Sequence, residues 1–236
     1  MKGFPSAFWA VSGLVFVGLA TNLLVAVVAA PFWALALAGD LRATWPWAAI
    51  AALLLGPAVM GANAVFTAYT RDGDTGAVRA FWRGWRGTLR RVMPAWLALW
   101  VFLIVVGTDL YAMRAWGLGS LALPVCGVLI ALALVTALTA GVGLAERPDL
   151  ARFVVVKAAV YLSVRRPGWS LVSAAVLAVV ARVVWVSPLL GLGVLTAPAL
   201  YVIWGNARRV LARFIREDAG AADEAVPVVG LGRGTP

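Results

Sequence analysis

Six long runs of apolar residues constrain the fold of this chain more than any other feature. They cover about residues 8–38, 47–70, 92–113, 120–145, 169–186 and 189–206. A helix needs about 20 apolar residues to cross the roughly 30 Å hydrocarbon core of a bilayer. Because lipid cannot pair with backbone groups, a spanning segment must satisfy its own hydrogen bonds. The sequence therefore predicts an all-α, polytopic helical membrane protein with about six transmembrane helices.

The overall composition excludes the other broad classes of protein. Hydrophobic residues make up 63% of the chain and charged residues only 13%. An ordinary soluble domain is about 45–50% apolar and about 25% charged. A soluble globular protein, a disordered chain and a coiled coil are therefore excluded.

The positions of the basic residues predict an orientation. The chain has 20 Lys and Arg against 10 Asp and Glu, and most basic residues gather in residues 71–91, 147–166 and 208–233. With six spans, all three segments and Lys2 fall on one side, as the positive-inside rule requires. We therefore expect both termini to be cytoplasmic. If residues 189–206 formed a re-entrant hairpin, only five spans would remain and the basic tail would lie outside.

The last twenty residues differ from the rest. Residues 217–236 are small, acidic and contain proline and glycine. Such a segment has too few apolar side chains to pack. The sequence thus predicts a membrane domain over residues 1–216 and a disordered cytoplasmic tail over residues 217–236.

Missing residue types narrow the chemistry. The chain has no histidine and a single cysteine, Cys126, which lies in an apolar run. Ser–His–Asp and Cys–His catalysis therefore have no base, and zinc or iron–sulfur sites lack ligands. No P-loop motif is present either. We expect no enzyme activity, no cofactor and no metal.

Residues 77–91 have the clearest periodicity outside the spans. One stripe at helical spacing is apolar and includes Phe81, Trp82 and Trp85, and the neighbouring stripe is basic: Arg79, Arg83, Arg86 and Arg90. This pattern predicts an amphipathic cytoplasmic helix that lies in the membrane plane against anionic lipids. This helix either serves only to anchor the chain in its membrane orientation or binds a protein partner. Nucleic-acid binding is not expected, because no recognition fold accompanies the arginines.

Two charges lie inside predicted spans. Asp109 and Arg182 sit at matching depths below the outer face. Charges within spans usually pair or face a cavity. The two side chains are therefore predicted to form an intramembrane pair, with separate snorkelling to the headgroups as the alternative.

A set of motifs resembles the YesL-like family of bacterial integral membrane proteins, a domain of unknown function. The matching residues are Asn22, Pro31, Gly56-Pro57-Ala58, Phe66, Tyr69, Arg71, Phe81-Trp82, Trp85, Arg90 and Asp109-Leu110-Tyr111. The resemblance implies a multi-pass protein of the bacterial inner membrane. It also implies an accessory or regulatory role in carbohydrate uptake, with permease subunits of ABC transporters as partners.

A self-sufficient small-solute transporter or channel is the alternative function. Transporters place polar groups on interrupted helices near the midplane of the bilayer. This chain offers few such groups: Asn22, Asn63, Asp109 and Arg182. An accessory protein without a catalytic site is therefore the leading interpretation, and the oligomeric state stays open.

The charge asymmetry leads to a test of topology. Reporter tags at Met1 and at Pro236 should both indicate the cytoplasm, and a tag near Arg114 should indicate the outside. Fusion reporters that are active on only one side of the membrane measure this directly. A C-terminal reporter active outside the cell would reject six spans in favour of five.

Overall fold

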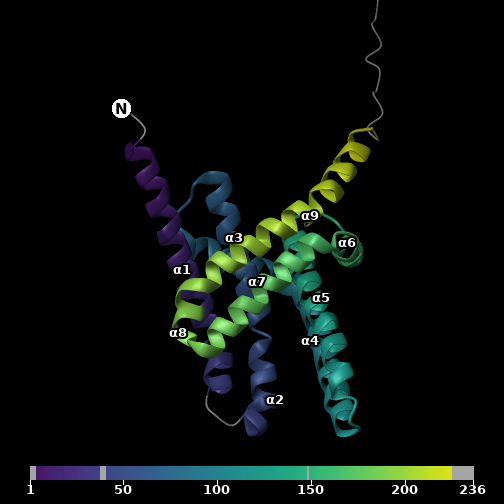
Figure 1. Ribbon diagram of the computed structural model, residues 1–236. Coiled ribbons are helices and arrows are strands. Elements are labelled where there is room, and N and C mark those ends of the chain that lie inside the picture. Colours follow the sequence, from purple (N-terminus) through teal and green to yellow (C-terminus); the bar gives the residue numbers. More distant parts are fainter. Residues whose placement is uncertain (1–3, 38–40, 148, 225–236) are drawn as a thin grey trace, which may run out of the picture.

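The computed structural model describes residues 4–37, 41–147 and 149–224, and all of its regular elements are helices (Figure 1). In chain order these are α1 (Phe4–Leu37), α2 (Leu41–Ala52), α3 (Leu55–Asp72), α4 (Ala77–Ala115), α5 (Gly119–Glu146), α6 (Arg152–Arg165), α7 (Pro167–Val186), α8 (Pro188–Leu190), the π-helix η1 (Gly191–Leu195) and α9 (Thr196–Glu224). The start of α1 and the end of α9 lie at the upper end in Figure 1, and the α4–α5 turn lies at the lower end.

Six helical stretches are long and apolar enough to cross a membrane, which confirms the expected fold class. They are Ser12–Leu35, Pro46–Asp72, Ala77–Ala115, Gly119–Glu146, Pro167–Val186 and Pro188–Ala212. The last stretch is helical throughout, so residues 189–206 do not form a re-entrant hairpin.

In the structure, the second predicted span consists of two helices rather than one. It breaks at Leu53 and Leu54, between α2 and α3. Pro57 explains the break, because its ring clashes with the carbonyl of residue 53 and it has no N–H to donate there. Leu53 and Leu54 instead donate to the carbonyl oxygens of Ile50 and Ala51 in a tighter turn.

The last span begins with an irregular turn that a distant side chain completes. Pro198 cannot donate to the carbonyls behind it, and the π-helix η1 precedes it. The Nδ2 group of Asn22, on α1, donates to the carbonyl oxygens of Gly193 at 2.9 Å and of Val194 at 3.0 Å. Its Oδ1 accepts from the N–H of Ala197 at 2.5 Å. Asn22 therefore pairs backbone groups that the helix itself leaves unpaired.

Helices α3 and α4 pack closely because glycines let them approach. A Cβ atom added to Gly61 would lie 2.7 Å from Cε2 of Phe81, whose side chain is fully buried. A Cβ atom added to Gly84 would lie 2.2 Å from Cβ of Ala64. Small residues permit this approach in membranes, where close packing contributes much of the association energy.

The main hydrophobic core is formed by side chains of five helices. It contains Val17 and Val25 of α1, Val65 and Phe66 of α3, Phe81 of α4, Val142 of α5, and Leu200, Trp204 and Leu211 of α9. These helices position the polar groups described below.

The amphipathic segment 77–91 is not a separate helix, which corrects the prediction. It forms the first part of α4, which continues through the third span to Ala115. With 39 residues, α4 is roughly 58 Å long, about twice the thickness of the hydrocarbon core. Pro94 removes one hydrogen bond near the junction and favours a bend there, but it does not end the helix. Packing of the segment against α3 supports its helical state.

The second half of α4 and the first half of α5 form an antiparallel hairpin (Figure 1). Its exposed apolar side chains include Val101, Val105, Leu121 and Val128. Apolar surface of this kind is expected to face lipid or another membrane helix.

Helix α6 was not predicted from the sequence. Its 14 residues extend roughly 21 Å, which is too short to cross a bilayer. In Figure 1 it is seen end-on, across the direction of α4 and α5. Val155, Ala159 and Ser163 share its buried face, while Phe153 and Tyr161 are exposed. The regular spacing of those three positions was the signal that could have revealed it.

The disordered tail was predicted to begin at residue 217, which is too early. Helix α9 continues to Glu224, so residues 217–224 are helical, and residues 225–236 lie outside the described part of the chain. Residues 217–224 are rich in alanine and extend a helix that already exists, which avoids the cost of nucleation.

Replacing Asn22 with leucine should destabilise the protein. The change leaves the carbonyls of Gly193 and Val194 and the N–H of Ala197 without their partner, at a cost of at least about 2 kcal/mol. A lower Tm in nanodiscs measures the loss. Thr21→Val is the matched control, because the hydroxyl of buried Thr21 donates to the carbonyl oxygen of Val17 in its own helix and so connects no two helices. Adding Pro198→Ala to the leucine variant should restore part of the stability, since an N–H returns. Equal Tm values for the two single variants would contradict the role of Asn22.

Two glycines of α4 should respond oppositely to alanine. Gly84→Ala should cost about 1–3 kcal/mol, because its Cβ would clash with Ala64 and lie 3.3 Å from the carbonyl oxygen of Met60. Gly87→Ala should stabilise by up to about 1 kcal/mol, because nothing lies within 4 Å of its added Cβ and alanine favours helices. Thermal unfolding of the two variants under identical conditions compares them. A stabilising Gly84→Ala would show that α3 and α4 are further apart.

Candidate functional site

Charged side chains gather where the end of α3, the end of α5 and the middle of α9 meet. There the structure has a hollow of about 610 Å³, which we call the arginine pocket. Its lining residues are Thr70, Arg71, Glu146, Arg147, Trp204, Gly205, Arg208, Arg209 and Ala212. Among the residues that the structure describes, the lining therefore includes four arginines and one glutamate.

A partly buried ion pair forms one wall of the pocket. Nε of Arg208 lies 2.8 Å from Oε1 of Glu146, and the Glu146 side chain is only 11% exposed. The guanidinium carbon of Arg208 also lies 4.9 Å from the centre of the Trp204 ring. Because both contacts restrain Arg208, its guanidinium is held in a defined position.

A second set of contacts holds α9 against α7. The guanidinium carbon of Arg209 lies 5.2 Å from the centre of the Trp169 ring. Nearby, the amide nitrogen of buried Asn206 donates to Oγ of buried Ser173 at 3.3 Å. These contacts fix the rotation of α9 and therefore where Arg208 and Arg209 emerge.

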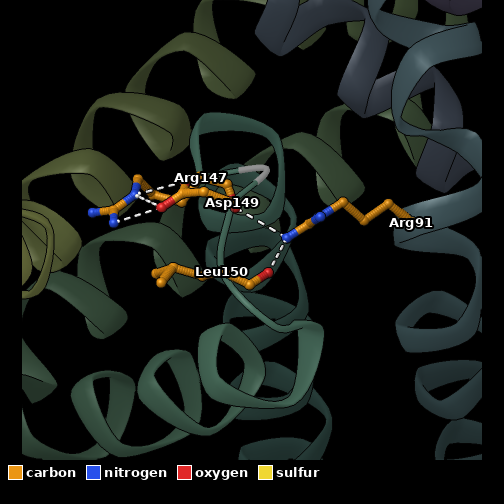
Figure 2. A network of polar contacts seen from close by, with 4 residues as sticks. All are labelled: Arg91, Arg147, Asp149 and Leu150. Atoms are coloured by element: carbon orange, nitrogen blue, oxygen red, sulfur yellow. Dashed lines mark hydrogen bonds and ion pairs between the residues drawn. The ribbon is translucent and has the colours of Figure 1, made fainter.

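The connection between α5 and α6 is held by an arginine from α4 (Figure 2). Nη2 of Arg91 donates to the carbonyl oxygen of Arg147 at 3.0 Å and to that of Leu150. The guanidinium of Arg147 in turn forms an ion pair with Asp149 at 2.8 Å. Arg91 thus satisfies carbonyl groups that follow the last turn of α5, where no helical donor remains.

The Arg147 contact also affects the acidity of Asp149. Its hydrogen bonds hold the pKa of the Asp149 carboxyl below the ordinary value. The contact favours the ionised carboxylate, so it is fully present above the ordinary pKa and is lost as the pH falls through the lowered one.

A neighbouring cavity of about 450 Å³ lies between α3, α4, α5 and α9 and shares Arg71, Glu146 and Trp204 with the arginine pocket. Asn63, Thr67, Asp72, Arg83 and Thr88 also line it. This cavity contains acidic and basic groups in balance, whereas the arginine pocket has an excess of positive charge. Only the latter is suited to an anion.

The structure places the predicted amphipathic residues on two faces of α4. Arg79, Arg83, Arg86 and Arg90 are exposed. Phe81 is fully buried and Trp85 packs partly against the core, while Trp82 is 36% exposed. The aromatic stripe therefore contacts protein as well as the surface, because α3 covers part of it.

Asp109 and Arg182 are not brought together. Within the described residues, the ion pairs are Arg147–Asp149 and Arg208–Glu146. Asp109 is exposed on α4 beside α5, and Arg182 is exposed on α7. Helix α7 packs against α9, η1 and α5, whereas the partners of α4 are α3, α5 and α1. Equal depth in the membrane predicted a pair, but depth does not fix which helices are neighbours.

The residues of the arginine pocket were not grouped from the sequence. Arg71, Arg147, Arg208 and Arg209 lie in three separate basic segments, which were interpreted only as markers of orientation. The Trp204–Arg208 spacing of four residues was the available signal, since such pairs meet on one helix face.

Comparisons of the chain with protein-family models, with curated proteins and with solved structures found no match.

Proposed function

We propose that this chain is a non-enzymatic integral membrane protein of the bacterial inner membrane, with cytoplasmic termini, that acts as an accessory subunit of a carbohydrate uptake system. The family resemblance of residues 56–111 supports the link to carbohydrate uptake. The basic segments support the orientation.

One observation carries the accessory role: three buried polar side chains within the spans bond to the bundle itself. Asn22 bonds to η1 and α9, Asn206 to Ser173, and Thr139 to the carbonyl oxygen of Val135 in its own helix. A transporter needs such groups to face a substrate path. Side chains that are engaged internally favour a structural and supporting role.

The π-helix favours the alternative, a small-solute transporter, because interrupted helices often hold substrates or ions in transporters. Here, however, the carbonyls of Gly193 and Val194 already accept hydrogen bonds from Asn22. A coordinating role would require Asn22 to release them. The π-helix is therefore better explained by its contact with Asn22 than by a role in binding a transported solute.

The α4–α5 hairpin offers a surface for a membrane partner. Its exposed apolar residues come from two long neighbouring helices, as helix–helix contact in a membrane requires. A permease subunit is the partner that the accessory role requires.

In-cell photo-crosslinking tests the proposal. A photoreactive residue at Val101 or Leu121, on the hairpin, should crosslink to a transmembrane permease subunit of a carbohydrate importer, identified by mass spectrometry. The same residue at exposed Val179 on α7 is the matched control and should give at least several-fold less of that product.

Liposomes that contain only this protein provide the opposing test. The accessory role predicts no sugar uptake above that of empty liposomes. Solute flux that Asn22→Leu abolishes, with no permease crosslink from the hairpin, would overturn the proposal in favour of the transporter.

A further inference from the structure

We propose that the arginine pocket is a binding site for a phosphate-bearing anion. This inference does not depend on the accessory role, because it concerns only the chemistry of the pocket.

The charges of the pocket are unequal. Among the described residues, four arginines line it, and Glu146 is the one carboxylate in its lining. Glu146 pairs with Arg208, and Arg147 pairs with Asp149. Within the described residues, Arg71 and Arg209 have no carboxylate at ion-pair distance. An anion in the pocket would therefore meet two uncompensated positive charges.

The arginines are also restrained before any ligand binds. Glu146 and the Trp204 ring hold Arg208, the Trp169 ring holds Arg209, and Asp149 holds Arg147. Restrained donors lose less conformational entropy when they bind, which raises affinity. A guanidinium has five N–H groups, so the contacts of Arg208 and Arg209 leave donors for a ligand.

Phosphate is the anion that this chemistry fits best. Arginine binds phosphate oxygens through two parallel hydrogen bonds, and clusters of arginine are typical of phosphate recognition. A hollow of about 610 Å³ has room for a phosphate group with an attached substituent. Ala212 and the small exposed part of Trp204 form the apolar wall that the substituent would meet.

Two sources could supply this group. The pocket lies at the end of the bundle where the basic segments gather, so the headgroup of an anionic lipid could enter it. A phosphate-bearing solute from the aqueous phase could also enter. Both sources present the same phosphate oxygens to the same arginines.

Thermal unfolding in phosphatidylcholine nanodiscs tests the site and separates the sources. In one arm, inorganic phosphate is added at constant ionic strength, maintained with chloride. In the other arm, phosphatidylglycerol replaces part of the phosphatidylcholine without added phosphate. The full chain should show a saturable rise in Tm in at least one arm. A rise with inorganic phosphate indicates an aqueous source, and a rise with phosphatidylglycerol alone indicates a headgroup.

The double variant Arg71→Gln/Arg209→Gln should weaken the apparent affinity by roughly tenfold or more. The matched control is Arg79→Gln/Arg86→Gln, which removes the same charge from exposed positions of α4 outside the pocket. Arg209→Lys keeps the charge but loses the planar donor pair, so it should be intermediate. If the double variant unfolds more easily without ligand, calorimetric titration below its Tm replaces the thermal readout.

Two results would overturn the proposal. One is the absence of a saturable rise in Tm in both arms. The other is an equal loss of affinity in the pocket variant and in the α4 control, which would show attraction to the general positive charge of this end.

Discussion

The side chain of Asn22 makes the contact on which much of the bundle depends. Backbone groups inside a membrane have no water to bond, so every carbonyl and N–H needs a partner within the protein. Pro198 and the π-helix leave such groups unpaired at the start of α9, and Asn22 pairs with three of them. The bond fixes α1 to α9, the helix that also carries Trp204 and Arg208. A single amide thus connects the first span to the start of the helix whose later turns carry Trp204 and Arg208.

The approach of α3 and α4 is a second constraint. Gly61 and Gly84 bring the two backbones together, and Phe81 fills the space beside Gly61. As a result, α4 has two parts with different surroundings. Its first part packs on α3 and exposes arginines, and its second part pairs with α5 and exposes apolar side chains. The charged and the apolar surfaces are therefore separated along one continuous helix.

The two proposals concern these two surfaces and rest on different physics. A permease partner would contact the apolar hairpin through close packing, which requires complementary shape. An anion would contact the arginine pocket through charge and directed hydrogen bonds. Arg91 links the regions structurally, because it extends from α4 to the carbonyls of Arg147 and Leu150 (Figure 2). The position of Arg147 beside the pocket thus depends on the first part of α4.

The sequence by itself determined the class of fold, the apolar segments long enough to cross a membrane, and the exposure of Arg79, Arg83, Arg86 and Arg90. Length, hydropathy and periodicity are local properties, so they can be read along the chain. Tertiary structure alone decided that Asn22 meets residues near 194, that Arg208 meets Glu146, and that Asp109 does not meet Arg182. In water, an apolar stripe indicates the face that a helix buries against its neighbours. In lipid the surroundings are as apolar as the side chains, so hydropathy cannot reveal which helices are neighbours.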